Sequence, residues 1–395
     1  MSLNREIVVS KKSLLGILLG LIVFMRTMPC YLWSVEDIIR PICAIIVLII
    51  CLFNMSKEKW TFWILLCLTL AYIWAVVFVD HSGFITLFNF LAFAFIPVLK
   101  KEVVYDTYKV FRYLIVFFLV CSIINLLFVK LGLTYDGKVI EPLNRLKRYK
   151  YIMYPFLVIP QGATSWRFHG IWDEPGVIGT ICGLMLIAER MNLKKKSNWV
   201  ILAGGLLSLS FFFYVAFLLG LVLFSSRLKH RFLTILIVFA VFMVSYNNPF
   251  LYNTIWYRFE WDASEGKLVG ENRNGSGLAE YYESIQGTSA FFTGEGSVIA
   301  SEYSGSASLY LIIVKHGFIF VALNFLGYGI LSWRVIKNKR EWITFFLFFL
   351  ATLYQRPGFY NTSSIFLYTM LIYEFGAVEV VYEAKKKRTK YIKSN

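Results

Sequence analysis

Long apolar runs recur through almost the whole chain, and they constrain its fold more than any other feature. They extend from Leu14 nearly to the C-terminus, and many approach the roughly 20 residues that cross a bilayer as a helix. Only 16% of the residues are charged, whereas a soluble domain carries about 25%. The pattern predicts an all-α polytopic membrane protein that forms a single membrane domain over residues 1–395.

The polar segments between the runs predict how the chain threads through the membrane. The first run follows Lys11 and Lys12 without a small-residue cleavage site, so it predicts an anchor rather than a cleaved signal peptide. One long apolar stretch is divided at residues 208–210, because an undivided helix would place basic residues 194–196 and 227–231 on opposite sides, and short basic loops prefer the cytoplasm. Both termini are then cytoplasmic. We expect about twelve spans, at approximately 13–26, 38–54, 60–79, 83–99, 108–131, 174–190, 197–209, 211–226, 231–247, 306–332, 341–355 and 360–380.

Two segments are too long to be simple turns, and both are expected outside the cytoplasm. Long loops are often functional. The first loop, 132–173, is basic, whereas the second, 248–305, is acidic and is expected to contain short helices. A basic outer loop has two interpretations: it binds an anion such as a lipid phosphate, or long loops cross the membrane regardless of charge.

The net charge of +16 follows from Lys and Arg in the short segments that we expect on the cytoplasmic side. We therefore predict no nucleic-acid partner. The six cysteines show neither a disulfide framework nor a metal-binding spacing, and the four histidines do not cluster in the sequence. No metal and no other cofactor is predicted.

The stretch RFHGIWDEPGVIGT, residues 167–180, places charged groups directly before an apolar run. Pro175 suits the first turn of a helix, so Glu174 falls at the positive end of that helix. One interpretation is structural, a helix start with Arg167 paired to a carboxylate. The other places Arg167 where a lipid-linked phosphate would lie. His169 is the histidine expected near such a site, with a solvated interface position as the alternative.

Further candidates lie in the second half of the chain. Arg273 lies in a Gly/Asn-rich turn, and residues 280–292 have the pattern of a short amphipathic helix. Tyr303 and its aromatic neighbours either stack on sugar rings or lie on the membrane surface. Lys315 lies well inside a predicted span, where a charge costs about 2.5–3.5 kcal/mol and indicates function unless it faces a polar cleft or snorkels. Arg356 is expected in an outer turn, where it joins the same site or anchors a lipid headgroup.

Taken together, these motifs resemble bacterial polysaccharide polymerases of the Wzy type and the related O-antigen ligases. The first matching element is the R-x-x-G-x-x-x-E-P block at 167–175, which enters a helix. The second is a later outer loop with Arg273 and a G-x-G at Gly294 and Gly296, followed by a helix that contains Gly317.

Two positions depart from this pattern. The ligases typically carry a His-Asn pair eleven residues before the glycine that corresponds to Gly317. This chain has Ser306 and Ala307 there. The missing histidine favours a polymerase over a ligase. Phe211 stands where the family often has an arginine.

The resemblance implies a glycosyltransferase C-like membrane fold and a metal-independent glycosyltransferase on the outer face of the bacterial inner membrane. Its substrate would be an undecaprenyl-pyrophosphate-linked oligosaccharide in the lipid bilayer, polymerised into O-antigen, capsule or exopolysaccharide. An acceptor hydroxyl would attack the anomeric carbon as lipid pyrophosphate leaves. A chain-length regulator and a flippase are the implied protein partners.

Within this hypothesis, arginines stabilise the leaving pyrophosphate and a carboxylate accepts the hydroxyl proton. Glu174 or Glu302 is the predicted base, with Glu174 alternatively orienting Arg167. The predicted catalytic residues are Arg167, Glu174, Arg273 and Glu302. The predicted substrate-binding residues are Arg258, His169, Tyr303, Lys315 and Arg356.

Other functions are also compatible with many spans. A flippase for lipid-linked oligosaccharides, or another secondary transporter, would usually show internal repeats and charged groups within its spans. No repeat is visible here. A membrane O-acyltransferase would need histidine and arginine pairs in inner or early spans, and none is evident.

Overall fold

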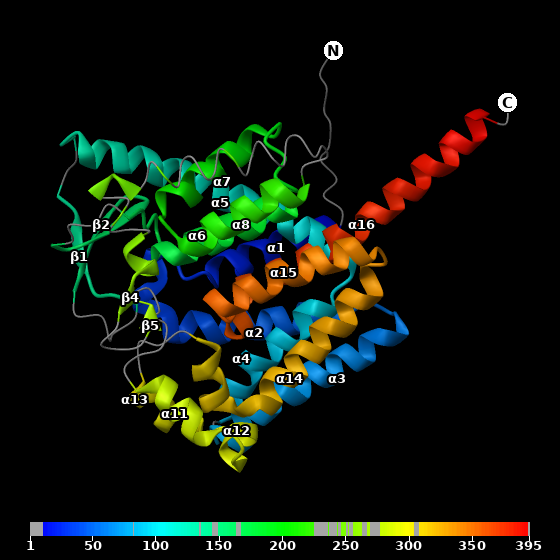
Figure 1. Cartoon of the computed structure of the whole chain (residues 1–395), viewed down its shortest axis with the longest axis horizontal. Helices are drawn as coiled ribbons and strands as arrows, with labels where there is room; N and C mark the ends of the chain where they lie inside the picture. The colour runs from blue at the N-terminus through cyan, green and yellow to red at the C-terminus, as the bar shows by residue number, and fades with distance from the viewer. Residues whose placement is uncertain are drawn as a thin grey trace.

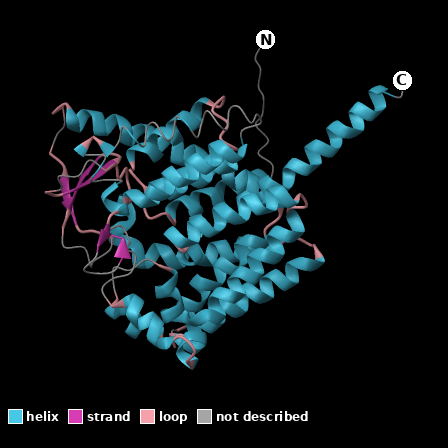
Figure 2. Cartoon of the chain, viewed as in Figure 1, coloured by secondary structure: helices cyan, strands magenta, loops and turns pink. Residues whose placement is uncertain are grey.

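The computed structural model describes residues 11–81, 83–133, 136–143, 149–162, 167–224, 277–303 and 308–393, together with short pieces between 236 and 268. The described chain is mostly helical (Figure 2). The helices that correspond to predicted spans are α1 (Lys11–Met25), α2 (Glu36–Phe53), α3 (Lys59–Ile73), α4 (Phe84–Phe95), α5 (Lys101–Lys130), α6 (Pro175–Ala188), α7 (Lys196–Leu207), α8 (Phe211–Phe224), α14 (Leu309–Val335), α15 (Lys339–Gln355) and α16 (Thr362–Lys393).

Three segments of the described chain are long and apolar enough to cross a membrane: α3 with the π-helical turn that continues it to Val79, α5, and α14. Shorter apolar helices cover Leu14–Met25, Thr86–Val98, Pro175–Ala188 and Phe211–Phe224. The length and composition of these helices support a membrane-embedded helical protein. The full count of spans stays a prediction.

Most of these helices lie within a few residues of the predicted spans, but α5 begins seven residues before the predicted 108 and α16 extends thirteen residues beyond the predicted 380. The ninth predicted span, 231–247, falls almost entirely outside the described residues. The predicted division at 208–210 is confirmed, because α7 ends at Leu207 and α8 begins at Phe211. Leu209 lies between them with a φ of 50°, a left-handed conformation that ends the first helix.

The prediction of an all-α chain is wrong for both long loops. The first contains a three-stranded antiparallel sheet, ordered β1 (Lys138–Ile140), β2 (Tyr151–Tyr154) and β3 (Leu157–Pro160). These short runs are rich in β-branched and aromatic residues, which favour strands. The second loop contains a short pair, β4 (Trp261–Asp262) and β5 (Lys267–Leu268).

The helix predicted over 280–292 is divided into two. They are α11 (Leu278–Ile285) and α12 (Ser289–Thr293), and a third short helix, α13 (Gly296–Glu302), follows. Gly287 separates the first two with a φ of 78°, outside the helical region. Hydrophobic periodicity predicted the helical content correctly but missed this break.

The centre of the bundle is α6, whose residues are nearly all buried. A helix that is apolar on every side is typical of such a central position. It packs against α7, α8 and α16. The strands of the two long loops lie at one end of the bundle, whereas α1 begins and α16 ends at the other (Figure 1).

Candidate functional site

The segment from Arg167 to Glu174 is held firmly in front of α6. The N–H of Cys30 donates to the carbonyl oxygen of Ile171 over 2.7 Å. The Tyr151 hydroxyl donates to the carbonyl oxygen of Asp173 over 2.6 Å, and burial is the main cause that raises the pKa of that tyrosine. The fully buried apolar side chains of the segment are Phe168, Ile171 and Trp172. The polar residues between them are thereby fixed at the mouth of α6.

These polar residues line a cavity of about 480 Å³. Four residues that the sequence singled out meet there: Arg167, His169, Glu174 and Arg356. The His169 ring is mostly buried, 5.8 Å from the Tyr151 ring. The first three residues come from one stretch of chain, whereas Arg356 arrives from the turn after α15. With Asp173, which also lines it, the cavity combines two guanidinium groups with two carboxylates and an imidazole.

Arg356 lies directly over the first turn of α6. Its guanidinium donates to the Glu174 carboxylate, and both side chains remain partly exposed, at 29% and 37% respectively. A Cβ on Gly176 would lie 2.5 Å from the Arg356 guanidinium, so the glycine makes room for this approach. A cation is disfavoured at the positive end of a helix, and Glu174 offsets that repulsion.

Glu174 makes no side-chain capping bond in α6, although Pro175 begins the helix as predicted. The Glu174 carboxylate pairs with Arg356, a partner that the sequence did not single out for it. Sequence alone could not identify this pair, because its members are 182 positions apart.

A second cavity of about 260 Å³ adjoins the first at Arg356. It lies between α6, α14 and α16, and its lining combines apolar residues with five residues that carry hydroxyl groups: Thr180, Ser308, Tyr360, Ser363 and Ser364. Ser308 also caps the start of α14, where its side chain accepts from Leu311. Hydroxyl groups both donate and accept hydrogen bonds, so this wall suits a polyhydroxylated ligand.

A separate polar cluster surrounds the start of α14. The Asp80 carboxylate accepts from the backbone and the hydroxyl of Ser297, over 2.8 and 2.7 Å. The same carboxylate lies 4.0 Å from Lys315 and 3.9 Å from His316. The His316 ring is fully buried, 5.1 Å from the Tyr360 ring. Lys315 therefore belongs to this cluster and does not line the cavity of Arg167.

The glycines of the second loop have a packing role. Gly317 interrupts α14 with a φ of 81° and a ψ of 163°, a conformation essentially restricted to glycine. A Cβ on Gly294 would lie 2.5 Å from the backbone nitrogen of Gly317. The two backbones thus touch, and beside them the backbone N–H of Glu295 donates to the carbonyl oxygen of Val314 over 2.9 Å.

Glu302 and Tyr303 lie apart from the cavity, at the end of α13. Glu302 is exposed. The Tyr303 ring lies 5.2 Å from that of Tyr281, whose hydroxyl donates to Glu295. That hydrogen bond, followed by burial, raises the pKa of Tyr281 to about 12. Burial, followed by nearby carboxylates, raises the pKa of Tyr303.

The remaining predicted residues are not placed at the cavity. Arg273 lies outside the described residues. Arg258 lies in the short helix Trp256–Phe259, and its side chain is not described. Sequence reasoning missed Asp80, although a lone acid at the end of an apolar run was a usable signal. It also missed Tyr149 and Gln161, two cavity residues that carry no local signal.

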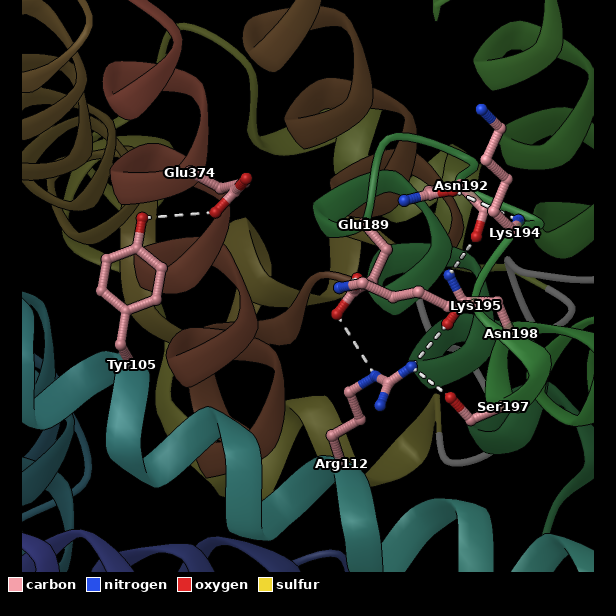
Figure 3. A network of polar contacts seen from close by, with 9 residues as sticks. All are labelled: Tyr105, Arg112, Glu189, Asn192, Lys194, Lys195, Ser197, Asn198 and Glu374. Atoms are coloured by element: carbon pink, nitrogen blue, oxygen red, sulfur yellow. Dashed lines mark hydrogen bonds and ion pairs between the residues drawn. The ribbon is translucent and has the colours of Figure 1, made fainter. Parts of the chain in front are cut away.

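The opposite end of the bundle holds a different polar network (Figure 3). The Arg112 guanidinium donates to Ser197 and Asn198 over 2.6 and 2.7 Å. It also pairs with Glu189 at 3.2 Å, and Lys195 contacts the same carboxylate. The network ties α5 to the end of α6 and the start of α7.

Among the described residues, no group of three or more His, Cys, Asp or Glu side chains lies close enough to hold a metal ion. Comparison with known proteins returned no matching family model, no matching curated protein and no matching solved structure.

Proposed function

We propose that this protein is a membrane glycosyltransferase that polymerises lipid-pyrophosphate-linked oligosaccharide repeats. One observation carries the proposal: two guanidinium groups, of Arg167 and Arg356, line one cavity at the start of the most buried helix. Arginine forks match phosphate oxygens in geometry and charge. Because the protein is embedded in the membrane, a lipid-linked phosphate suits this cavity better than a water-soluble phosphate compound does.

In the proposed reaction, a hydroxyl oxygen of the acceptor sugar bonds to the anomeric carbon of the donor. The bond from that carbon to the pyrophosphate oxygen breaks, and the electron pair leaves with the lipid pyrophosphate. Arg167 and Arg356 stabilise the negative charge that develops on the leaving group. The adjoining hydroxyl-lined cavity, with Ser308 and Tyr360, holds the sugars.

The carboxylates have different roles in this scheme. Glu174 is a positioning residue, because its carboxylate holds Arg356 over the cavity. An ion-paired carboxylate is also a weaker base. The hydroxyl proton then passes to another group that lines the cavity, His169 or Asp173. Glu302, the other predicted base, does not line it.

The proposal includes a topology of about twelve spans in a bacterial plasma membrane, with both termini cytoplasmic and both long loops outside. The strands of the two loops and the start of α6 lie at the end of the bundle opposite the C-terminus of α16 (Figure 1). The cavity is lined by residues at that start of α6. The cavity would thus face the outer leaflet, where lipid-linked repeats await polymerisation.

The test is a reconstitution. Purified protein in liposomes receives undecaprenyl-pyrophosphate-linked repeats from its own host, without nucleotide or metal, and products are separated on a gel. We expect a ladder that Arg167→Gln abolishes. Lys150→Gln is the matched control, because Lys150 lies in the same loop, pairs with Glu141 and does not line the cavity.

Two results would defeat the proposal. One is a ladder of unchanged length and yield from Arg167→Gln. The other is the absence of any ladder together with movement of the same lipid across the liposome bilayer, which would identify a flippase.

A further inference from the structure

A groove runs along α14, and none of its lining residues lines the candidate cavity. It has a volume of about 920 Å³ and lies between α3 and α15. Its floor is apolar and includes Phe318, Val321, Phe325 and Ile330. Gly329 opens the floor further, because a Cβ there would meet no atom within 4 Å. The groove therefore has room for hydrocarbon over most of the length of α14.

One end of this groove has a distinct composition. Four tryptophans line it there: Trp60 and Trp63 from the start of α3, Trp333 from the end of α14, and Trp342 from the start of α15. Trp333 is 66% exposed although it is large and aromatic. Tryptophan is enriched where a membrane protein meets the headgroup layer, because its indole has an apolar body and a polar N–H.

Arg334 lies among these indoles and lines the same groove. It is exposed, and it makes no ion pair or hydrogen bond with any part of the chain that the structure describes. The nearest acid along the chain, Glu341, is already paired with Arg190 at 3.0 Å. Arg334 also complements the negative end of α14, but that role does not require a groove.

Charge complementarity identifies the occupant. An apolar channel that ends at an arginine with no protein partner matches a molecule with hydrocarbon chains and an anionic headgroup. Basic pockets between membrane helices bind such headgroups, and each nearby Lys or Arg favours them by about 1 kcal/mol, or roughly fivefold in affinity.

We propose that this groove binds an anionic phospholipid, with its headgroup at Arg334 and its acyl chains along α14 toward Phe318. The site is separate from the cavity of Arg167 and does not rest on glycosyl transfer. It rests on the membrane-embedded character of the helices.

Native mass spectrometry of the detergent-purified full chain tests the proposal. Phosphatidylglycerol and phosphatidylcholine with identical acyl chains are titrated separately. We expect phosphatidylglycerol to bind about fivefold more tightly. Arg334→Gln should remove that preference, whereas Arg340→Gln should keep it. Arg340 is equally exposed and basic but does not line the groove.

A second variant tests the acyl-chain channel. Gly329→Phe places a ring in the open space of the groove, and it should weaken the binding of both lipids. Gly83→Phe is its control, because Gly83 also has open space around it but lies outside the groove.

Three outcomes would overturn the proposal. Equal affinity of the wild-type chain for the two lipids would refute the headgroup site. Unchanged binding in both Arg334→Gln and Gly329→Phe would place the lipid elsewhere. A dimer that Gly329→Phe dissociates, with no lipid bound, would assign the groove to a second copy of the chain.

Discussion

The two ends of the helical bundle both hold arginine–glutamate pairs, but they use them differently. At the end shown in Figure 3, Arg112 and Glu189 are nearly buried, with exposed fractions of 13% and 8%. At the other end, Arg356 and Glu174 are exposed by 29% and 37% and line a cavity.

The two arginines differ in the partners of their guanidinium groups. Arg112 finds a carboxylate, a hydroxyl and an amide within the protein. Its donors are directed to neighbouring helices, so the network joins α5 to α7. Arg356 contacts one carboxylate and otherwise faces a cavity shared with Arg167. A closed network stabilises the fold, whereas an open pair can bind a ligand.

The largest expected effect on stability comes from Gly317→Ala. This change alters the end of the bundle that holds the cavity, and it leaves both arginine–glutamate pairs in place. The new Cβ would overlap the carbonyl oxygen of Phe292, and the backbone conformation suits glycine alone. We expect a loss of about 3 kcal/mol in the free energy of unfolding, and activity should fall with it. Denaturation in detergent measures the change. A fully stable variant would show that the α12–α14 contact is loose. Gly329→Ala is the control.

Arg356→Gln should separate activity from stability. Removal of one donor that stabilises developing charge costs about 100-fold in rate. The free energy of unfolding should change little, because the pair with Glu174 is partly exposed. Rates of ladder formation and unfolding curves are compared in one preparation. If Arg356→Gln lowered both the rate and the free energy of unfolding, this pair would be structural like that of Arg112, and the contrast between the two ends of the bundle would be wrong.

Arg112→Ala should give the opposite result. Loss of its guanidinium removes the donor to Ser197 and Asn198 and one of the cations that pair with Glu189. We expect the free energy of unfolding to fall by about 1–3 kcal/mol, while the activity of the folded fraction is retained. Lys109→Ala on the same helix is the control, since Lys109 is exposed and its ion pair is with Asp106, three residues away on the same helix. A loss of activity at full stability would contradict the structural role.

The smallest expected effect is the dependence of stability on pH through Tyr281. The pKa of Tyr281 is raised to about 12 by its hydrogen bond to Glu295. The folded state therefore holds this proton more tightly than the unfolded state, whose tyrosine has a pKa of about 10. The contribution is complete below pH 10 and is lost as pH rises toward 12.

We expect Tyr281→Phe to remove that pH dependence and to lower stability by less than about 1 kcal/mol, because the contact is close to solvent. Unfolding curves at successive alkaline pH values measure it, and Tyr257→Phe, an exposed tyrosine, serves as the control. If the free energy of unfolding changed with pH in the same way for wild type and Tyr281→Phe, the hydrogen bond of Tyr281 would not be the source of the pH dependence.

Local sequence predicted much of the helical framework. The division at 208–210 and the start of α6 at Pro175 were both correct. Patterns failed where a glycine interrupts a periodic segment, as at Gly287, and where short β-branched runs pair with each other, as in β2 and β3. Such pairing depends on two segments at once, so neither reveals it alone.

The sequence by itself determined the helical, membrane-embedded class of the protein, the approximate positions of most described helices and the charged stretch before α6. These depend on hydropathy and on local turn chemistry, which act over a few neighbouring residues. Only the tertiary structure decided that Glu174 pairs with Arg356, 182 positions away, and that Asp80 holds Ser297, 217 positions away. Those contacts depend on which helices pack together, and hydrophobic packing is not directional enough for residue spacing to reveal it.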